Sequence, residues 1–192
     1  MTWATRERKS PAVGITATGR AHQLTVSMPQ TNLRADLLQD WRANRPDLRG
    51  RLVMVAFRLA HRASRNRYGA RRVPATAYGL VYRVVVEWVL SIEIPWKTSI
   101  GPGARLRHGV GLVINDRSVI GARVLLRHGV TIGNAVAAGP CPVIGDDVEI
   151  GAGAVVIGGI TVGDGARIGA NAVVTKDVPA GAVAVGNPMR LR

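Results

Sequence analysis

Large aliphatic residues recur every six positions along the C-terminal half of the chain. The series skips one place, at Ala138, and comprises Ile114, Ile120, Leu126, Ile132, Ile144, Ile150, Val156, Val162, Ile168 and Val174. Glycine directly follows six of these ten residues. A six-residue period matches neither the 3.6-residue period of a helix nor the two-residue period of a strand. The pattern is typical of a solenoid.

Each six-residue unit supplies one inward-facing aliphatic side chain and one tight turn, where a glycine lets the backbone bend. Three such units would close one triangular coil. Successive coils stack in parallel at about 4.8 Å, and their inward side chains form a core that no single coil could form alone. We therefore predict a mainly β fold, a parallel β-helix of hexapeptide repeats over residues 93–192.

Two irregularities interrupt the period. Residues 134–142 are rich in small residues, Gly and Pro, which predicts a loop that leaves the coil. Upstream, Ile100 and Leu106 are spaced like the other repeat residues but are out of phase with Ile114 by two positions. This phase shift predicts a two-residue bulge between Leu106 and Ile114.

The half of the chain before the repeat has helical patterns. Helices are expected over residues 32–42, 46–65 and 74–91. Residues 79–95 are apolar, but charged residues interrupt them, so a buried helix is expected rather than a membrane span. We expect this α-helical region, residues 32–92, to cover the open end of the β-helix, where strand edges would otherwise be exposed.

The N-terminal residues and the cysteine content indicate the compartment. Residues 1–31 are polar and aperiodic, which predicts a disordered N-terminal arm. The start of the chain lacks the apolar core of a signal peptide. A single cysteine, Cys141, excludes an intramolecular disulfide and fits a reducing compartment. A cytoplasmic location is therefore expected.

Charge is distributed unevenly along the chain. Residues 1–92 contain 16 Lys and Arg against 5 Asp and Glu, a net charge of +11 out of +14 for the whole chain. Such a basic half can attract nucleic acid, an anionic lipid surface or a polyanionic substrate. Aromatic residues are sparse and no nucleic-acid-binding motif is present, so nucleic-acid binding is not predicted. Association with a membrane surface stays open.

Two of the four histidines lie in the repeats. His108 and His128 each stand two positions after an inward leucine, in the repeated text LRHGV. Their separation along the chain equals one coil plus the bulge, so both are expected at one edge in adjacent coils. A surface imidazole can act as a general base toward a hydroxyl when a carboxylate orients it. Glu93, nearly one coil before His108, is the candidate partner; the alternative is a pair of solvated turn histidines.

A zinc site is the competing interpretation of these histidines. Catalytic zinc needs three protein ligands and a water molecule. The repeats contain two histidines and no third one at ligand spacing. No metal site is therefore predicted.

Residues 91–187 resemble the serine acetyltransferase branch of the hexapeptide-repeat acyltransferases, in segments such as SIEIPWKTSIGPGARLRHGVGLVIN and VLLRHGVTIGN. The resemblance to colanic-acid-type exopolysaccharide O-acetyltransferases is closer and extends into the helical part, DWRANRPDLRGRLVMVAFRLAHRA. It implies a left-handed β-helix and a homotrimer, with pairing of trimers left open. It also implies acetyl-CoA as the donor, bound between neighbouring subunits.

The resemblance also implies roles for single residues. The family's catalytic histidine falls on His108 and its acidic partner on Glu93. His108 would deprotonate the acceptor hydroxyl, the alkoxide would attack the thioester, and backbone N–H groups would stabilise the oxyanion. His128 would contact the substrate. The positions that match the family's acetyl-CoA contacts, mostly through the backbone, are Ala152, Gly158 and Ala170. Lys176 and Arg190 are expected phosphate partners of acetyl-CoA; the alternative is that they are surface cations.

The chain departs from the serine acetyltransferases where they bind serine. They carry an Asp before the catalytic histidine and Arg-His-Pro in the loop; here these places hold Arg107 and Pro140-Cys141-Pro142. Arg107 cannot provide the negative charge that would bind the ammonium group of serine. The loop likewise lacks the Arg and His that would bind the carboxylate of serine. Arg107 and Cys141 are expected to contact a different acceptor.

We therefore predict an acetyl-CoA-dependent O-acetyltransferase that acts on a carbohydrate hydroxyl. Two alternatives stay open. One is serine O-acetyltransferase activity in cysteine biosynthesis. The other is a trimeric binding or structural solenoid without catalysis.

Overall fold

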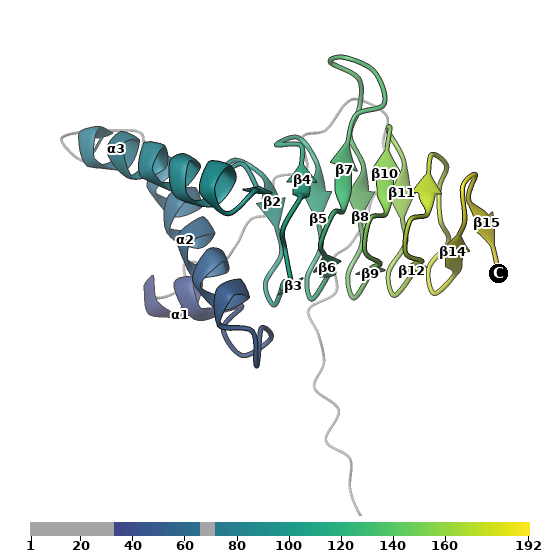
Figure 1. Cartoon of the computed structure of the whole chain (residues 1–192), viewed down its shortest axis with the longest axis horizontal. Helices are drawn as coiled ribbons and strands as arrows, with labels where there is room; N and C mark the ends of the chain where they lie inside the picture. The colour runs from purple at the N-terminus through teal and green to yellow at the C-terminus, as the bar shows by residue number, and fades with distance from the viewer. Residues whose placement is uncertain (1–32, 66–71) are drawn as a thin grey trace, which may run out of the picture. The chain divides into compact units, whose positions relative to one another are not determined.

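The computed structural model describes residues 33–65 and 72–192. The predicted N-terminal arm, residues 1–31, lies outside this part of the chain. The described residues form helices followed by fifteen short strands, which wind into a parallel β-helix (Figure 1). The predicted fold class, a mainly β solenoid with N-terminal helices, is confirmed.

The strands form three sheets, which are the faces of the coil. Sheet A contains β1 (Ile92–Glu93), β4 (Leu112–Ile114), β7 (Thr131–Gly133), β10 (Val155–Ile157) and β13 (Val173–Val174). Sheet B contains β2 (Ser99–Ile100), β5 (Val119–Ile120), β8 (Val143–Ile144) and β11 (Thr161–Val162). Sheet C contains β3 (Arg105–Arg107), β6 (Leu125–Arg127), β9 (Glu149–Ile150), β12 (Arg167–Ile168), β14 (Val183–Val185) and β15 (Arg190–Leu191). Each pair of neighbouring strands is parallel except β14 and β15.

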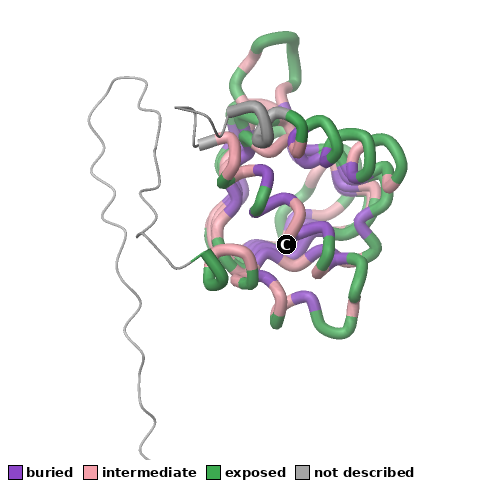
Figure 2. The backbone as a smooth tube through the Cα atoms, turned by 90° about the vertical axis from the view of Figure 1, so that its left-hand side faces the viewer, coloured by how far each residue is buried: buried purple, intermediate pink, exposed green. Residues whose placement is uncertain are grey.

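The core is the stack of aliphatic residues that defines the repeat. On sheet A, Ile114 pairs with Ile132, and Val156 pairs with Val174. All ten members of the series are at most 3 % exposed. Viewed from the helical end, buried residues line the inside of the coil and exposed residues lie at its corners (Figure 2). Since each inward side chain packs on the equivalent one in the next turn, the apolar core is continuous.

The predicted two-residue bulge is present. Leu106 pairs with Leu126, whereas Ile114 pairs with Ile132. The first of these pairs is separated along the chain by two more positions than the second. The first turn therefore contains two extra residues between β3 and β4.

Backbone hydrogen bonds identify the two inserted residues. The carbonyl of Val110 accepts a hydrogen bond from the amide of Gly129 in the next turn. The carbonyl of His128 accepts the same kind of bond from the amide of Gly153, one turn further on. Val110 and His128 thus occupy equivalent positions in successive turns. His108 and Gly109 are consequently the inserted residues.

The predicted loop at residues 134–142 leaves the coil between β7 and β8. The guanidinium of Arg117 donates hydrogen bonds to the carbonyls of Ala138 and Gly139, at 3.2 and 2.8 Å. These contacts hold the loop against the corner that joins sheets A and B.

The helices lie at the N-terminal end of the strand stack (Figure 1). They are α1 (Leu33–Leu38), α2 (Leu48–Arg65), α3 (Arg72–Tyr82) and the π-helix η1 (Arg83–Val89). The first helix is shorter than the prediction of residues 32–42. It ends at Leu38 because the following residues turn toward the β-helix, where Asp40 and Asn44 bond the edge of the first coil.

Three buried polar side chains close that edge. Asp40 and Asn44 accept hydrogen bonds from the amides of Ala104 and Leu106, at 2.9 and 2.7 Å. Arg58 of α2 donates to the carbonyl of Ile100 at 2.6 Å and forms an ion pair with Asp40 at 2.8 Å. Backbone groups that another strand would otherwise pair are thus satisfied by side chains from the helical region.

The expectation of a buried helix over residues 79–95 is wrong for the outer face of α3 and η1, which is exposed. Tyr82 and Val86 are buried, whereas Val81 and Trp88 are exposed. The reason is that only one side of α3 and η1 packs against α2 and the first coil. No helix within residues 33–65 or 72–192 is long and apolar enough to span a membrane.

Candidate active site

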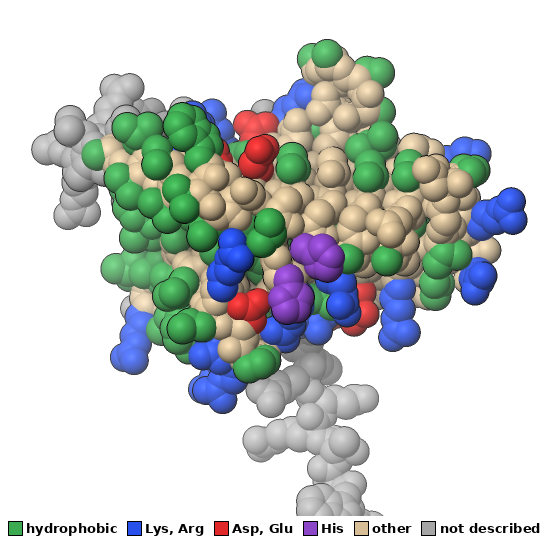
Figure 3. Space-filling model, viewed as in Figure 1, with side chains coloured by type: hydrophobic (Ala, Val, Ile, Leu, Met, Phe, Trp, Pro, Cys, Tyr) green, Lys and Arg blue, Asp and Glu red, His purple; other side chains and the backbone are tan. Residues whose placement is uncertain are grey.

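The two repeat histidines meet on the surface at the corner where sheet C turns into sheet A. We call this corner, residues 108–111, 128–130, 151–154 and 169–172, the histidine corner. The ring centroids of His108 and His128 are 6.4 Å apart, with an angle of 67° between the ring planes. Both side chains are exposed, and Figure 3 shows two histidines side by side with basic side chains next to them. The pair can therefore meet a substrate from solvent.

The inserted turn projects His108 out of the regular coil. His108 has a φ of +58°, in the left-handed region that few residues adopt. The next residue, Gly109, is buried, and a Cβ atom there would lie 2.9 Å from Leu106 Cδ2 and 3.2 Å from Ile92 Cδ1. The turn is thus packed tightly onto the core, which fixes the backbone of His108.

Asp47 is a candidate site residue that was not predicted from the sequence. It stands before α2 and caps this helix, accepting a hydrogen bond from the amide of Gly50 at 3.0 Å. Burial raises the pKa of Asp47, but hydrogen bonds from the backbone amides of Gly50, His108 and Arg49, with the charge of His108, outweigh burial and lower it. The sequence marks Asp47 only as a helix start; the contact with the His108 turn arises from packing.

Glu93 lies on β1, exposed, with its Cα paired to that of Val113 in β4. Its charge acts on a second carboxyl group: burial and Glu93 together raise the pKa of Glu87, against the lowering effect of Arg83. Within the described residues, no hydrogen bond or ion pair joins Glu93 to His108. The Glu93–His108 pair stays a prediction.

Arg107 lies directly before His108 but points elsewhere. Its guanidinium donates a hydrogen bond to the carbonyl of Arg45 at 2.9 Å. Arg127 is paired with Arg107 across β3 and β6 and is more exposed. Arg127 is therefore a cation beside the histidine corner that was not predicted from the sequence. The signal was present, because Arg127 directly precedes His128 just as Arg107 directly precedes His108.

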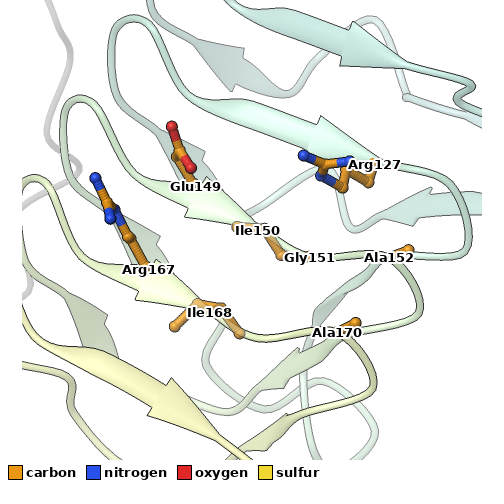
Figure 4. Close-up of a pocket in the computed structure, with 8 residues that line it drawn as sticks. All are labelled: Arg127, Glu149, Ile150, Gly151, Ala152, Arg167, Ile168 and Ala170. Carbon is orange, nitrogen blue, oxygen red and sulfur yellow. The ribbon is translucent and has the colours of Figure 1, made fainter. Parts of the chain in front are cut away.

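A shallow groove of about 320 Å³ runs from this arginine along the later coils. It is lined by Arg127, Glu149, Ile150, Gly151, Ala152, Arg167, Ile168 and Ala170 (Figure 4). Ala152 and Ala170 project from equivalent places in adjacent turns, whereas the Arg127 and Arg167 side chains extend from strands β6 and β12. Glu149 forms a long ion pair with Arg105 at 3.8 Å. Small residues thus lie along the groove, and its charged side chains are two arginines and one glutamate.

The expected acetyl-CoA contacts do not all lie together. Ala152 and Ala170 line the groove. Gly158, by contrast, lies at the corner between sheets A and B, where its amide donates to the carbonyl of Gly133 at 2.9 Å. Arg190 lines a second pocket at the C-terminal end of the solenoid.

Cys141 and Lys176 also lie at the corner between sheets A and B. Cys141 is half-buried in the loop at residues 134–142, and Lys176 is exposed after β13. We call this edge, residues 115–118, 134–142, 158–160 and 175–178, the loop corner. In one chain, the width of sheet A separates the loop corner from the histidine corner. Within residues 33–65 and 72–192, no group of three or more His, Cys, Asp or Glu is arranged to hold a metal ion.

Comparison with known proteins places the chain in a family. Residues 141–176 match the family model of the bacterial transferase hexapeptide, six repeats. The chain is 37 % identical over 111 residues to WcaB of Escherichia coli, whose name assigns it provisionally to acetylation in colanic acid biosynthesis. The match covers 56 % of this chain and 68 % of WcaB. The chain belongs to the hexapeptide-repeat acetyltransferases.

Serine acetyltransferases are also similar to this hexapeptide-repeat enzyme. Serine acetyltransferase 4 of Arabidopsis thaliana is 38 % identical over 86 residues, which are 45 % of this chain and 22 % of that protein. Among solved structures, soybean serine acetyltransferase complexed with serine superposes with a TM-score of 0.71 at 36 % identity. That superposition covers 83 % of this chain and 69 % of the soybean chain. The protein is thus an acyltransferase.

Proposed function

We propose that this hexapeptide-repeat enzyme transfers an acetyl group from acetyl-CoA to a hydroxyl group of a carbohydrate. The observation that supports this acceptor most directly is the charge around the histidine corner. The exposed Arg127 lies there, and the carboxylate of Asp47 beside His108 already accepts a hydrogen bond from the backbone amide of Gly50. This environment disfavours an ammonium group and suits a neutral or anionic sugar.

His108 is the proposed general base. Its imidazole takes the proton of the acceptor hydroxyl, so that the oxygen can attack the acyl carbon, and it can return the proton to the leaving sulfur. The inserted turn and Asp47 position this ring, while His128, 6.4 Å away between ring centroids, is the proposed acceptor contact. Glu93 is the proposed acidic partner of His108, to be tested by Glu93→Gln.

The groove suits the donor. Acetyl-CoA supplies an activated acetyl group as a thioester when it is bound. The small residues Ala152 and Ala170 leave room along the groove floor, and the guanidinium groups of Arg127 and Arg167 suit phosphate groups. Gly158, Lys176 and Arg190 remain proposed contacts. They lie away from this groove within one chain.

A homotrimer would resolve this separation for Gly158 and Lys176. The loop corner and the histidine corner are neighbouring edges of a triangular solenoid. In a closed cyclic assembly, the loop corner of one subunit can face the histidine corner of the next. We propose that acetyl-CoA binds between them, so that Cys141, Gly158 and Lys176 serve the site of the adjacent subunit.

The test is an assay of free CoA release with acetyl-CoA and a panel of acceptors that includes neutral sugars, uronic acids and L-serine. We expect a sugar to be the best acceptor. His108→Ala should lower kcat by about 10²–10⁴-fold. His128→Ala is the matched variant; it should mainly raise the KM of the acceptor. Unchanged CoA release in His108→Ala would refute the general-base role.

Serine O-acetylation is the second candidate, because the soybean structure that superposes on this chain contains serine. If L-serine has the highest kcat/KM in the panel, the carbohydrate proposal is wrong. If calorimetry detects no binding of acetyl-CoA, the donor proposal fails as well, whatever the acceptor.

A further inference from the structure

Six large apolar side chains lie on the outer face of α3 and η1. They are Leu80, Val81, Val84, Val85, Trp88 and Val89, with exposed fractions of 63, 57, 38, 46, 72 and 71 %. All six are exposed whereas Tyr82 and Val86 are buried, so the six lie on the side of α3 and η1 that faces away from the core. We call them the apolar stripe. In the space-filling view, hydrophobic side chains gather over the helical end of the molecule (Figure 3).

The fold of the chain does not require the apolar stripe. The inner face of the same helices supplies the packing, since Tyr82 and Val86 are 2 and 3 % exposed. The hydroxyl of Tyr82 donates to the carbonyl of Ile94 at 2.8 Å and ties this inner face to the first coil. A contiguous apolar surface of this kind indicates an interaction site.

Charge decides between the possible occupants. Residues 33–92 contain 12 Arg and 4 Asp or Glu, a net charge of +8. The one acid in the sequence of α3 and η1, Glu87, is paired with Arg83 at 3.4 Å, and Arg49 donates to the carbonyl of Leu90 at the end of the apolar stripe. An anionic surface attracts a region with this excess of positive charge, which favours an anionic occupant over a neutral or cationic one.

The shape of the apolar stripe favours a lipid surface. Its helices present one apolar side with an exposed tryptophan, which is typical of segments that lie in the plane of the membrane interface. Neither α3 nor η1 is long and apolar enough to cross a bilayer, and the same holds for the other helices of the described residues. We propose that the apolar stripe docks the enzyme on an anionic membrane surface. This proposal is independent of the proposed acceptor.

Co-sedimentation of the full chain with large unilamellar vesicles tests the docking. We use phosphatidylcholine vesicles with and without phosphatidylglycerol, at low and high salt. The wild-type protein should bind the phosphatidylglycerol vesicles and be released by salt. The double variant Val81→Ser/Trp88→Ser should lower the partition coefficient by at least about tenfold. Both positions are exposed, so thermal unfolding should be unchanged.

Val136→Ser is the matched control, because Val136 is 67 % exposed but lies on the loop at residues 134–142. It should bind vesicles like wild type. CoA release with a soluble acceptor should be unchanged in the double variant, so that failure of docking and failure of the proposed function are separate results. Equal binding by wild type and the double variant would overturn the proposal. So would an absence of vesicle binding combined with a smaller oligomer in the double variant, which would make the apolar stripe an interface between copies.

Discussion

At the scale of the residue, the histidine corner depends on two inserted residues and one helix cap. The insertion of His108 and Gly109 takes the imidazole out of the regular turn. The carboxylate of Asp47 connects the first turn of α2 to the backbone of His108. We therefore propose Asp47 as a positioning residue, and its effects on stability and on activity can be measured separately.

Asp47 should stabilise the fold in a pH-dependent way. Its pKa is lowered in the folded state, so its contribution is present above the ordinary pKa of an aspartate and is lost as the pH falls through the folded-state value. We expect Asp47→Ala to lower the free energy of unfolding by about 1 kcal/mol at pH 7. The difference from wild type should shrink below about pH 4. Urea unfolding of both proteins at pH 7 and below about pH 4 measures this difference in the free energy of unfolding. Asp116→Ala, at an exposed residue, is the control; a pH-independent loss in Asp47→Ala would contradict the assignment.

Asp47 should also affect turnover through the position of His108. Asp47→Ala should lower kcat by about tenfold, because a misplaced base is a poor base. Asp47→Asn keeps a side-chain oxygen that can accept the backbone hydrogen bonds and should restore most of kcat. If both variants lose the same activity, the charge matters and not the position.

At the scale of the element, the turns are tight because coils touch backbone to backbone. In the turn between β11 and β12, a Cβ atom on Gly163 would lie 2.5 Å from the amide nitrogen of Ala180. Gly165, in the same turn, has a φ of +66° but no neighbouring atom within 4 Å of such a Cβ. One turn thus offers two glycines that are required for different reasons.

These glycines give a paired prediction. Gly163→Ala should destabilise the protein by about 2–3 kcal/mol, since the next coil must move. Gly165→Ala should cost about 1 kcal/mol, since only the left-handed backbone is unfavourable. Urea unfolding of both variants compares them. A larger loss in Gly165→Ala would mean that backbone strain, and not coil contact, limits these turns.

The repeat elements could be predicted from the sequence, but the helical ones only in part. Because the six-residue period recurs in every coil, it determines which residues point inward. The ten aliphatic residues of the series are buried as expected. The exposed apolar face of α3 and η1 was not expected, because an apolar segment has the same composition whether or not a partner covers it. The role of Asp47 depends on where α2 meets the first coil, which no local pattern records.

At the scale of the whole molecule, the helical region closes the solenoid through buried polar groups. Arg58 and Asp40 are 5 and 1 % exposed and bond both each other and the first coil. Arg58→Met should lower the free energy of unfolding by about 3–5 kcal/mol, because it leaves a buried carboxylate unpaired. Arg62→Met, which removes the exposed pair with Asp36, should cost less than about 1 kcal/mol. Urea unfolding measures both free energies. Similar decreases in the two variants would mean that the buried Arg58–Asp40 pair does not hold the helical region on the β-helix.

The proposed trimer makes a prediction about mixed assemblies. A His108→Ala subunit and a subunit lacking residues 135–139 should each be inactive alone. In randomly mixed trimers, about a quarter of the sites would join an intact histidine corner to an intact loop corner. Co-expression should therefore restore about a quarter of the wild-type activity. No recovery would mean that each site lies within one subunit, and full activity of the loop variant alone would exclude the loop from the site.

The sequence by itself determined the solenoid, the core residues and the adjacency of His108 and His128. Period, phase shift and residue count are properties of the chain alone, and in a stacked coil they translate directly into neighbours. The tertiary structure decided that Asp47 meets the His108 turn, that the expected acetyl-CoA contacts divide between two corners and the C-terminal end, and that the apolar stripe faces outward. These features depend on how separate elements pack, and packing depends on contacts between residues that are distant in the sequence.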